Sequence, residues 1–396
     1  MLLRITYAYP RACMPYLFET EDHAAIRASA RRFAQTHIAP HSAEWEEAEE
    51  FPIELYRTAC AAGVAGLGYP EALGGQGGDL GHILAGSEEM LLAGRSVGTL
   101  VGLGSHGIAL PPIVRFGTPE QQRAFVTPCL KDGKISALAI TEPGGGSDVA
   151  SLATKAVRDG DHYVVTGAKT FITSGTRADF ITAAVRTGGP GHGGVSLLVI
   201  ESGTPGFTVS KKLKKTGWWA SDTAELHFDE CRVPVANRIG VENGAFPMIM
   251  MNFASERLML AGQCVAIAEL AYREAVAYAR ERHAFGKPLT GFQVTRHKLA
   301  DMATRLAAAR ALTGECVQRV LAPGGDLKSA GLAAMAKNTA TDMCSFVCDH
   351  AVQIHGGYGY MRETLVERLY RDARLYPIGG GTREIMNEVI AKTEGY

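Results

Sequence analysis

The chain has 396 residues, of which 46% are hydrophobic and 20% charged, values typical of an ordinary globular protein. Forty lysines and arginines against 41 acidic residues give a net charge of -1, which excludes a chain-wide attraction to nucleic acid or to an anionic membrane. At this length we expect two or three domains instead of a single hydrophobic core.

Cysteine usage and apolar runs indicate a chain with reduced thiols and no membrane helix. Eight cysteines are scattered without a CxxC pair or zinc-finger spacing, at positions 13, 60, 129, 231, 264, 316, 344 and 348. This pattern predicts buried thiols, no metal site and a cytoplasmic location. No apolar run approaches the about 18 residues of a membrane helix. The first thirteen residues carry two arginines and no acid, and an upstream start codon before Met14 explains them better than a weak targeting segment.

The N-terminal third predicts helices. From Glu19 to about Gly133, apolar residues recur at helical spacing. A glycine-rich loop, "YPEALGGQGGDL" (Tyr69 to Leu80), interrupts the pattern. A new helix is predicted after it, with Thr118 as N-cap and Pro119 at the first helical position.

The middle segment, from about Ile135 to Pro234, predicts strands. Six β-rich runs are separated by Gly, Asp and Pro turns: "ISALAI", "HYVVTGAKTFIT", "FITAAVRT", "VSLLVIE", "FTVSKKL" and "AELHFDECRVP". No helix-length pattern lies between them, which favours an antiparallel barrel or sandwich over a wound βαβ sheet. The basic run "KKLKK" (Lys211 to Lys215) predicts a solvated edge more strongly than an anion site.

After Asn237 the pattern is helical again for about 150 residues. Residues 262 to 285 are small or aliphatic nearly all round, which is typical of a helix buried between neighbours. The chain is therefore predicted as α+β in three domains: an N-terminal helical domain (18–134), a central antiparallel β-barrel (135–236) and a C-terminal four-helix bundle (237–396).

Three clusters carry the residue types of a binding site. "TEPGGGSDV" (Thr141 to Val149) follows a strand, and consecutive glycines let backbone N–H groups approach a ligand closely, although a tight turn explains them equally well. "RERHAFGKPLTGFQ" (Arg280 to Gln293) and "QIHGGYGYMRE" (Gln353 to Glu363) also have structural explanations, as a helix cap and a helix exit. Together, and in this order, they point to one ligand.

These segments, with "RLYRDARLYPI" and "GTREI", resemble the acyl-CoA dehydrogenase family from about Phe18 to the end of the chain. The resemblance implies a helical domain, a β-barrel and a four-helix bundle, assembled as a homotetramer. It also implies FAD-dependent α,β-dehydrogenation of an acyl-CoA thioester to the trans-2-enoyl-CoA, with electrons passed to an electron-transfer flavoprotein. A eukaryotic source would imply the mitochondrial matrix.

Matching the family motifs position by position implies a set of flavin and substrate contacts. The residues matched to FAD are Leu138, Ile140, Thr141, Gly146, Ser147, Phe171, Thr173, Arg282, Phe285, Gln293, Gln353, Gly356, Gly357, Thr382 and Glu384. Those matched to the substrate are Ser147, Arg257, Gly379 and Gly380. In relatives, the contacts that match Arg282, Phe285 and Gln293 come from a neighbouring subunit. An arginine there suits a diphosphate.

The catalytic base departs from the commonest family pattern. Many relatives carry a Tyr and then a Glu where this chain has Gly379 and Gly380. "ERLMLAG" resembles the isovaleryl- and long-chain-type branch, in which the base lies on a helix, and it places Glu256 among apolar residues. Burial raises a carboxylate's pKa and makes it a better base. The alternatives for Glu256 are a structural ion pair or a first-turn residue at a helix N-terminus.

Three other interpretations follow from the same residues. The chain without its loop glutamate would be a silent acyl-CoA-binding paralogue, or the fold would serve an oxygen-using oxidase or monooxygenase. In the third interpretation, the substrate is a thioester of a carrier protein in place of acyl-CoA. Glycines at 379 to 381 remove side-chain volume, which predicts an open gap that admits a branched or bulky acyl chain.

Overall fold

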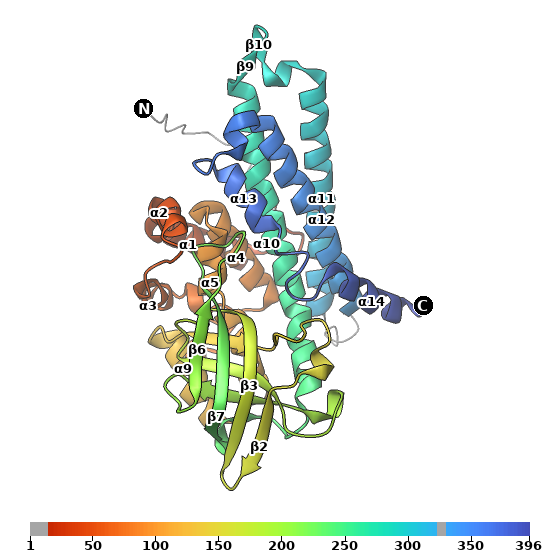
Figure 1. The fold of residues 1–396 in the computed structure, drawn as a ribbon. Helices are drawn as coiled ribbons and strands as arrows, with labels where there is room; N and C mark the ends of the chain where they lie inside the picture. The colour runs from red at the N-terminus through yellow and green to blue at the C-terminus, as the bar shows by residue number, and fades with distance from the viewer. Residues whose placement is uncertain (1–14, 323–329) are drawn as a thin grey trace.

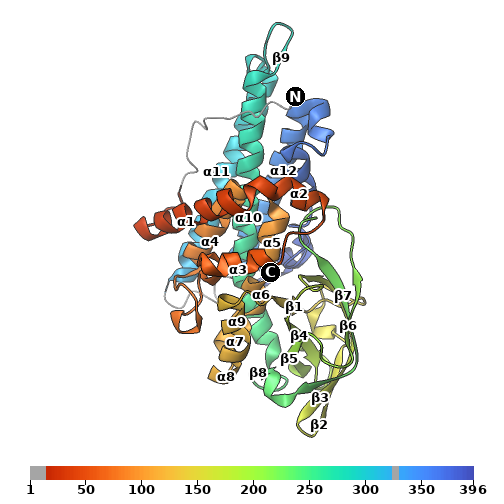
Figure 2. The same cartoon turned by 90° about the vertical axis from the view of Figure 1, so that its left-hand side faces the viewer.

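The computed structural model describes residues 15–322 and 330–396, and the predictions about residues 1–13 lie outside these ranges. The N-terminal third is helical, as predicted. Figures 1 and 2 show its first helices beside the middle of the long C-terminal helices and its last helices lower down, beside the sheet. Its helices are α1 (Glu21–His37), α2 (Ser42–Glu47), α3 (Glu54–Ala61), α4 (Leu80–Gly94), α5 (Val97–Leu103), α6 (His106–Ala109), α7 (Pro111–Phe116), α8 (Pro119–Gln121) and α9 (Thr127–Lys131). The predicted cap is confirmed, because the Thr118 hydroxyl accepts from the Gln121 N–H and Pro119 opens α8.

The middle segment forms one sheet, and each of the six predicted runs contains a strand. The strands are β1 (Ser136–Ala139), β2 (Lys155–Asp159), β3 (His162–Thr173), β4 (Phe180–Arg186), β5 (Val195–Glu201), β6 (Phe207–Lys212), β7 (Thr223–Pro234) and β8 (Arg238–Ile239). Their order is β6-β7-β3-β2-β4-β5-β8, with β1 paired to β4 off this path.

The predicted antiparallel barrel is not confirmed. The path of paired strands ends at β6 on one side and at β8 on the other, so the sheet stays open. The sheet is also mixed, because β1 runs parallel to β4 and β2 meets β4 in a parallel pair. The connection from β1 to β4 contains two further strands, which makes it long enough for a parallel crossover.

The basic run lies at the free edge of this sheet. Lys211 and Lys212 are exposed at the end of β6, where lysines discourage edge-to-edge pairing with another chain. The solvated-edge prediction is therefore confirmed for these two residues. It is wrong for Lys215, because the Lys215 ammonium turns inward and donates to the Ser221 and Thr223 side-chain oxygens.

The C-terminal third is helical, as predicted. Its elements are α10 (Ala245–Glu281), α11 (Gln293–Leu321), α12 (Ala330–His355), α13 (Leu365–Ala373) and α14 (Arg383–Glu394), with the hairpin β9 (His283–Ala284) and β10 (Lys287–Pro288) at the far end of α10. The three long helices run side by side, and α13 and α14 pack against α12 (Figure 1). Small side chains such as Ala268 and Ala271 on α10 are completely buried, so the helices approach closely.

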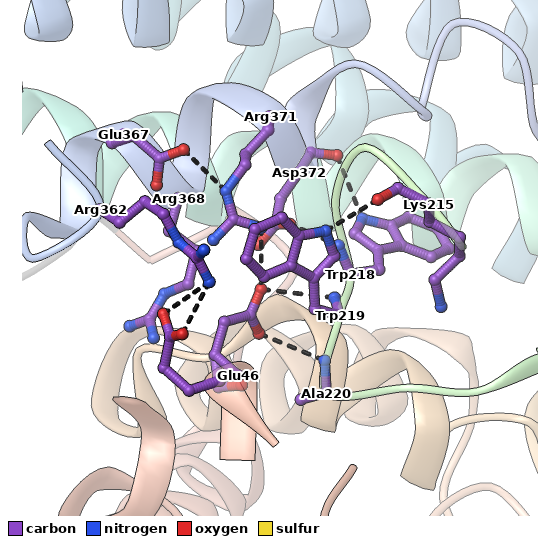
Figure 3. Close-up of polar contacts among 12 residues, drawn as sticks. Glu46, Lys215, Trp218, Trp219, Ala220, Arg362, Glu367, Arg368, Arg371 and Asp372 are labelled. Atoms are coloured by element: carbon purple, nitrogen blue, oxygen red, sulfur yellow. Dashed lines mark hydrogen bonds and ion pairs between the residues drawn. The ribbon is translucent and has the colours of Figure 1, made fainter. Parts of the chain in front are cut away.

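A polar junction ties the three parts of the chain together (Figure 3). Glu46 of α2 accepts hydrogen bonds from the backbone N–H groups of Trp219 and Ala220, in the loop between β6 and β7, and from Arg371 of α13. Asp372, also on α13, accepts from the Trp218 N–H at 2.6 Å. The buried charges therefore hold the helical parts and the sheet in one arrangement. The predicted domain boundaries stay a prediction.

The seven cysteines in the described ranges are free thiols, and six of them are buried; Cys13 lies outside these ranges. Within residues 15–322 and 330–396 no single helix is long and apolar enough to cross a membrane, while the bent pair formed by α5 and residues 106–116 passes that test on length and composition alone.

Candidate active site

The glycine-rich loop after β1 is fixed to β3 by buried polar contacts. The Lys169 ammonium on β3 donates to the Ile140 carbonyl at 3.0 Å and to the Glu142 carboxylate at 2.8 Å. Glu142 also accepts from two backbone N–H groups further along the loop, at Ala153 and Thr154. A buried ion pair is stable only when its remaining polar atoms are satisfied in this way. The loop that begins at Thr141 is therefore held rigidly beside β3.

This arrangement brings one group of the predicted flavin residues together. The Thr170 N–H donates to the Thr141 carbonyl at 2.9 Å, so Thr141 lies next to Phe171 and close to Thr173. Ile140 belongs to the same apolar core as Ile249, on the first half of α10. The β1 loop, the end of β3 and α10 thus form one region.

Phe171 adopts a conformation that indicates function. Its φ is +60°, in the left-handed region, at an irregularity in the pairing of β3 with β7. Its ring is 69% exposed. A left-handed non-glycine residue costs on the order of 1–3 kcal/mol and is concentrated at ligand sites. A large planar ligand lying on this ring would bury the exposed surface.

The open glycines of the loop fit such a ligand. A Cβ at Gly144 or Gly145 would meet no atom within 4 Å, so the backbone there is uncovered. Gly146 packs on Thr141, and Ser147 is exposed beside it. Exposed N–H groups on one side and an aromatic ring on the other suit the isoalloxazine ring of a flavin.

A second group of predicted residues lines a cleft at the far end of α10. The cleft has a volume of about 550 Å³, and Arg282, Gly356 and Gly357 are among its lining residues. Both glycines are open, because a Cβ at either would meet nothing within 4 Å. His355 stacks on Tyr278 at 4.3 Å between ring centroids and forms part of the wall. A guanidinium beside open backbone fits a diphosphate.

Some residues that were predicted to contact FAD lie outside these two groups. Phe285 is 95% exposed on the hairpin, and Gln293 and Gln353 are exposed, but none of the three lines the cleft. Thr382 acts as the N-cap of α14, where its hydroxyl accepts from the Ile385 N–H, and Glu384 is exposed on the first turn of that helix. Their roles toward the dinucleotide stay predictions.

Glu256 is the carboxylate of the site, and its side chain is half-buried. It lies about three turns inside α10, which begins at Ala245, so the first-turn alternative is wrong. The helix start was missed because Gly244 offers no side-chain cap. No residue in the described ranges forms an ion pair with Glu256, and its Oε2 atom is buried without a hydrogen-bond partner. Burial raises the pKa of Glu256 to about 7, and Arg257 and Lys337 limit this rise.

The glycine segment Gly379–Gly381 lies directly against Glu256. A Cβ built at Gly380 would be 3.5 Å from the Glu256 Oε1 atom, so the helix position and the loop position of the base converge in space. The open gap stays a prediction at Gly379, where a Cβ would make only ordinary contacts with Leu375, at 3.8 and 3.9 Å. At Gly380 and Gly381 the space is already filled, because a Cβ would come within 2.5 Å of Leu260 and 2.7 Å of Met386. Both also have positive φ values, +66° and +98°.

Two buried cations hold this segment, and sequence reasoning gave a structural role to neither. Arg257, predicted as a substrate contact or part of the site wall, donates from Nε to the Gly380 carbonyl at 3.3 Å. Lys337 on α12 donates to the Gly381 carbonyl at 2.6 Å and was missed altogether. The only signal for Lys337 was a lone lysine in the small, apolar run "LAAMAKNTA".

One further group has the residue types of a metal site. Ligand atoms of His23, Asp79 and His82 lie within 4.8 Å of one another. They already serve as helix caps: Asp79 accepts from the Gly81 and His82 N–H groups, and His23 accepts from Thr20. The two imidazole rings stack on each other at 4.0 Å between centroids. We assign no metal here.

A mixed sheet between two helical regions of the chain, an open glycine loop beside an exposed aromatic residue and a half-buried, unpaired carboxylate are features of a flavin-dependent oxidoreductase. Three family models match it: the acyl-CoA dehydrogenase N-terminal domain at residues 20–132, the middle domain at 137–231 and the C-terminal domain at 243–394. The chain belongs to the acyl-CoA dehydrogenase family, and FAD is the cofactor of that family.

Individual relatives agree with this assignment. The chain is 39% identical over 379 residues to the long-chain specific acyl-CoA dehydrogenase of Sus scrofa, covering 94% of this chain and 86% of the relative. It is 37% identical to the isobutyryl-CoA dehydrogenase of Bos taurus, covering 96% and 90%. A crystal structure of a probable acyl-CoA dehydrogenase from Mycobacterium abscessus superposes with a TM-score of 0.93 at 52% identity, covering 95% of this chain and 99% of that one.

Proposed function

We propose that this enzyme dehydrogenates an acyl-CoA thioester between its α and β carbons, with Glu256 as the base. The observation that carries the proposal is the half-buried carboxylate of Glu256, whose buried Oε2 has no hydrogen-bond partner and which lies against Gly380, in a family whose reaction needs a base. An unpaired carboxylate in such a place costs stability, so its retention indicates function.

The surroundings of Glu256 suit proton abstraction near neutral pH. A general base is most effective when its pKa lies near the working pH, and burial raises the pKa of Glu256 to about 7. The carboxylate would accept the α proton at one of its oxygens. The raised pKa of Glu256 suits the removal of an α proton that the neighbouring thioester makes only moderately acidic.

The cofactor would lie across the sheet surface beside this base. Phe171 and Thr173 at the end of β3, and Thr141 and Ser147 on the β1 loop, would hold the ring and orient the thioester. When bound, FAD accepts the hydride that leaves the β carbon. Glu142 and Lys169 hold the β1 loop against β3 and so would keep these flavin-binding residues in place.

We propose that the site is completed by a second copy of the chain. Arg282 lies just past the C-terminal end of α10, roughly 40 Å along the helix from Glu256, which exceeds the reach of one flavin dinucleotide. The cleft at Arg282 would therefore hold the diphosphate and adenosine of a flavin bound to a neighbouring copy. A homotetramer satisfies this requirement.

Arg282→Ala should weaken FAD binding about 10- to 100-fold, because a charge-assisted contact to phosphate is worth about 1.5–3 kcal/mol. FAD content after gel filtration, read from the flavin absorbance per chain, measures the effect. Arg280→Ala is the matched control, since Arg280 is exposed on the same helix turn and does not line the cleft. Equal retention by both variants would remove Arg282 from the flavin site.

The remaining assignments follow from the family and the charge of the chain. We propose an electron-transfer flavoprotein as the electron acceptor, and a cytoplasmic location in a bacterium or the mitochondrial matrix in a eukaryote. We propose that acyl groups enter past Gly379, where a Cβ would make only ordinary contacts, and are favoured when they are branched or long.

Anaerobic titration of the purified holoenzyme with a panel of acyl-CoA thioesters tests the proposal. Bleaching of the flavin by one class of thioester is expected, and the panel then ranks chain length and branching. Bleaching accompanied by rapid peroxide formation on exposure to air would favour the oxidase interpretation. A flavin that no thioester bleaches would contradict the proposed reaction.

A further inference from the structure

Lys337 is a buried ammonium that the reaction as described above does not use. It lies on α12, its side chain is 1% exposed, and Nζ donates to the Gly381 carbonyl at 2.6 Å. No carboxylate of the described residues lies within ion-pair distance of it. A buried charge that donates to a neutral carbonyl and has no anionic partner is costly to keep. Its retention on α12 therefore needs a reason.

Geometry places Lys337 opposite the base. A Cβ at Gly380 would lie 3.5 Å from Glu256 Oε1 and 3.7 Å from Lys337 Cε, so the two side chains approach the same glycine from α10 and from α12. A side chain at position 380 would occupy the space between them. The glycine thus allows an anion and a cation on different helices to share one apolar region without forming a direct ion pair.

Lys337 also fixes the backbone of the glycine segment. Gly380 and Gly381 both have left-handed φ values, a conformation with little intrinsic preference to persist. Arg257 holds the first of their carbonyls from α10, and Lys337 holds the second from α12. With both donors present, the segment is attached to the two helices that form the wall around Glu256.

The charged and titratable groups around the pair are few. Those facing Glu256 are Arg257 on its own helix and Lys337 on α12. Those facing Lys337 are Glu256, Arg257 and the Cys264 thiol, all on α10. Burial lowers the pKa of Lys337 to about 8, so it is charged at neutral pH.

We propose that Lys337 is a positioning residue for the base: it holds Gly381 against the helices, and its charge favours the ionised form of Glu256 at neutral pH. This inference rests on the proposed function, in which Glu256 abstracts the α proton. A positive charge near a carboxylate in a protein interior favours the ionised form of that carboxylate. Without it, a larger fraction of Glu256 would be protonated and inactive at pH 7.

Two substitutions separate the two roles. Lys337→Gln removes the charge and keeps a donor for the Gly381 carbonyl, whereas Lys337→Met removes both. In each variant we expect the acid limb of the flavin-reduction rate to move up by roughly one pH unit, which is about a fivefold loss at pH 7. The rates of Lys337→Gln and wild type should converge above about pH 8, where the Lys337 ammonium loses its charge in the wild type as well. Lys337→Met should also have a lower plateau.

The readout independent of turnover is an infrared titration of the Glu256 carboxyl band in the holoenzyme, assigned by its absence in Glu256→Gln. Tyr376→Phe is the control: it removes the hydrogen bond to Gln263 near the same segment without changing charge, and should leave the midpoint unmoved. An unshifted carboxyl midpoint in Lys337→Gln, with rates lowered equally at every pH, would overturn the proposal. Full activity of Glu256→Gln would instead refute the base assignment, which is a different failure.

Discussion

Glu256→Gln should slow flavin reduction by acyl-CoA about 10²- to 10⁴-fold, the usual contribution of a general base. The amide has nearly the shape of the carboxylate and cannot accept the α proton. FAD content and thioester binding should be retained. Among the described residues, Glu256 forms no hydrogen bond with the residues of the cleft or with the glycines of the loop. Anaerobic stopped-flow reduction across the acyl-CoA panel measures the rate.

Stability supplies an independent check on the same variant. The folded-state pKa of Glu256 is raised to about 7 from an ordinary 4.5, so the native state holds a proton that the unfolded state releases between these values. The stabilisation from that proton is complete below about pH 4.5 and is lost as the pH rises through about 7. The melting temperature of Glu256→Gln relative to wild type should therefore increase between about pH 5 and pH 8.

Glu269→Gln provides the matched control on the same helix. Glu269 forms an ion pair with Arg273 one turn away, at 2.6 Å, and is remote from the glycine segment. Its substitution should leave the reduction rate unchanged. If Glu256→Gln and wild type bleach alike, the base lies elsewhere.

Local sequence patterns predicted the elements well, for physical reasons visible in the structure. Alternating and continuous apolar runs specified strands such as β3 and β5, and a Thr-Pro pair specified the start of α8. Glu256 was identifiable because a single acid among Met, Phe and Leu is costly without a role. In each case the deciding interactions lie within a few residues of one another along the chain.

Long-range features could not be predicted in this way. Barrel closure depends on whether the edges of β6 and β8 meet, and no local pattern encodes that. A lysine within a helix is ordinarily assigned to the solvent face. The buried contact of Lys337 with the glycine segment could therefore not be predicted, because it depends on how α12 packs. The occupied space at Gly380 likewise depends on Leu260 of another element.

Glu46→Ala should destabilise the chain by about 3 kcal/mol, the cost of leaving buried polar groups without their anion. Glu46 is 2% exposed and serves two backbone N–H groups and the Arg371 guanidinium (Figure 3). Arg371 would keep its second partner, Glu367, which limits the loss. Glu46→Gln, which keeps an acceptor without the charge, should lie between wild type and Glu46→Ala in melting temperature.

The adjacent residue offers a control that separates burial from charge. Glu47 pairs with Arg362 at 2.7 Å, but both side chains are more than half exposed, so Glu47→Ala should cost less than about 1 kcal/mol. Trp218, held by Asp372 in the same junction, packs edge-on against Tyr376 at 5.2 Å, and Tyr376 leads into the glycine segment. Glu46→Ala should therefore also slow flavin reduction, whereas Glu47→Ala should not. If the two substitutions lowered stability and flavin reduction equally, Glu46 would contribute no more than an exposed surface charge does.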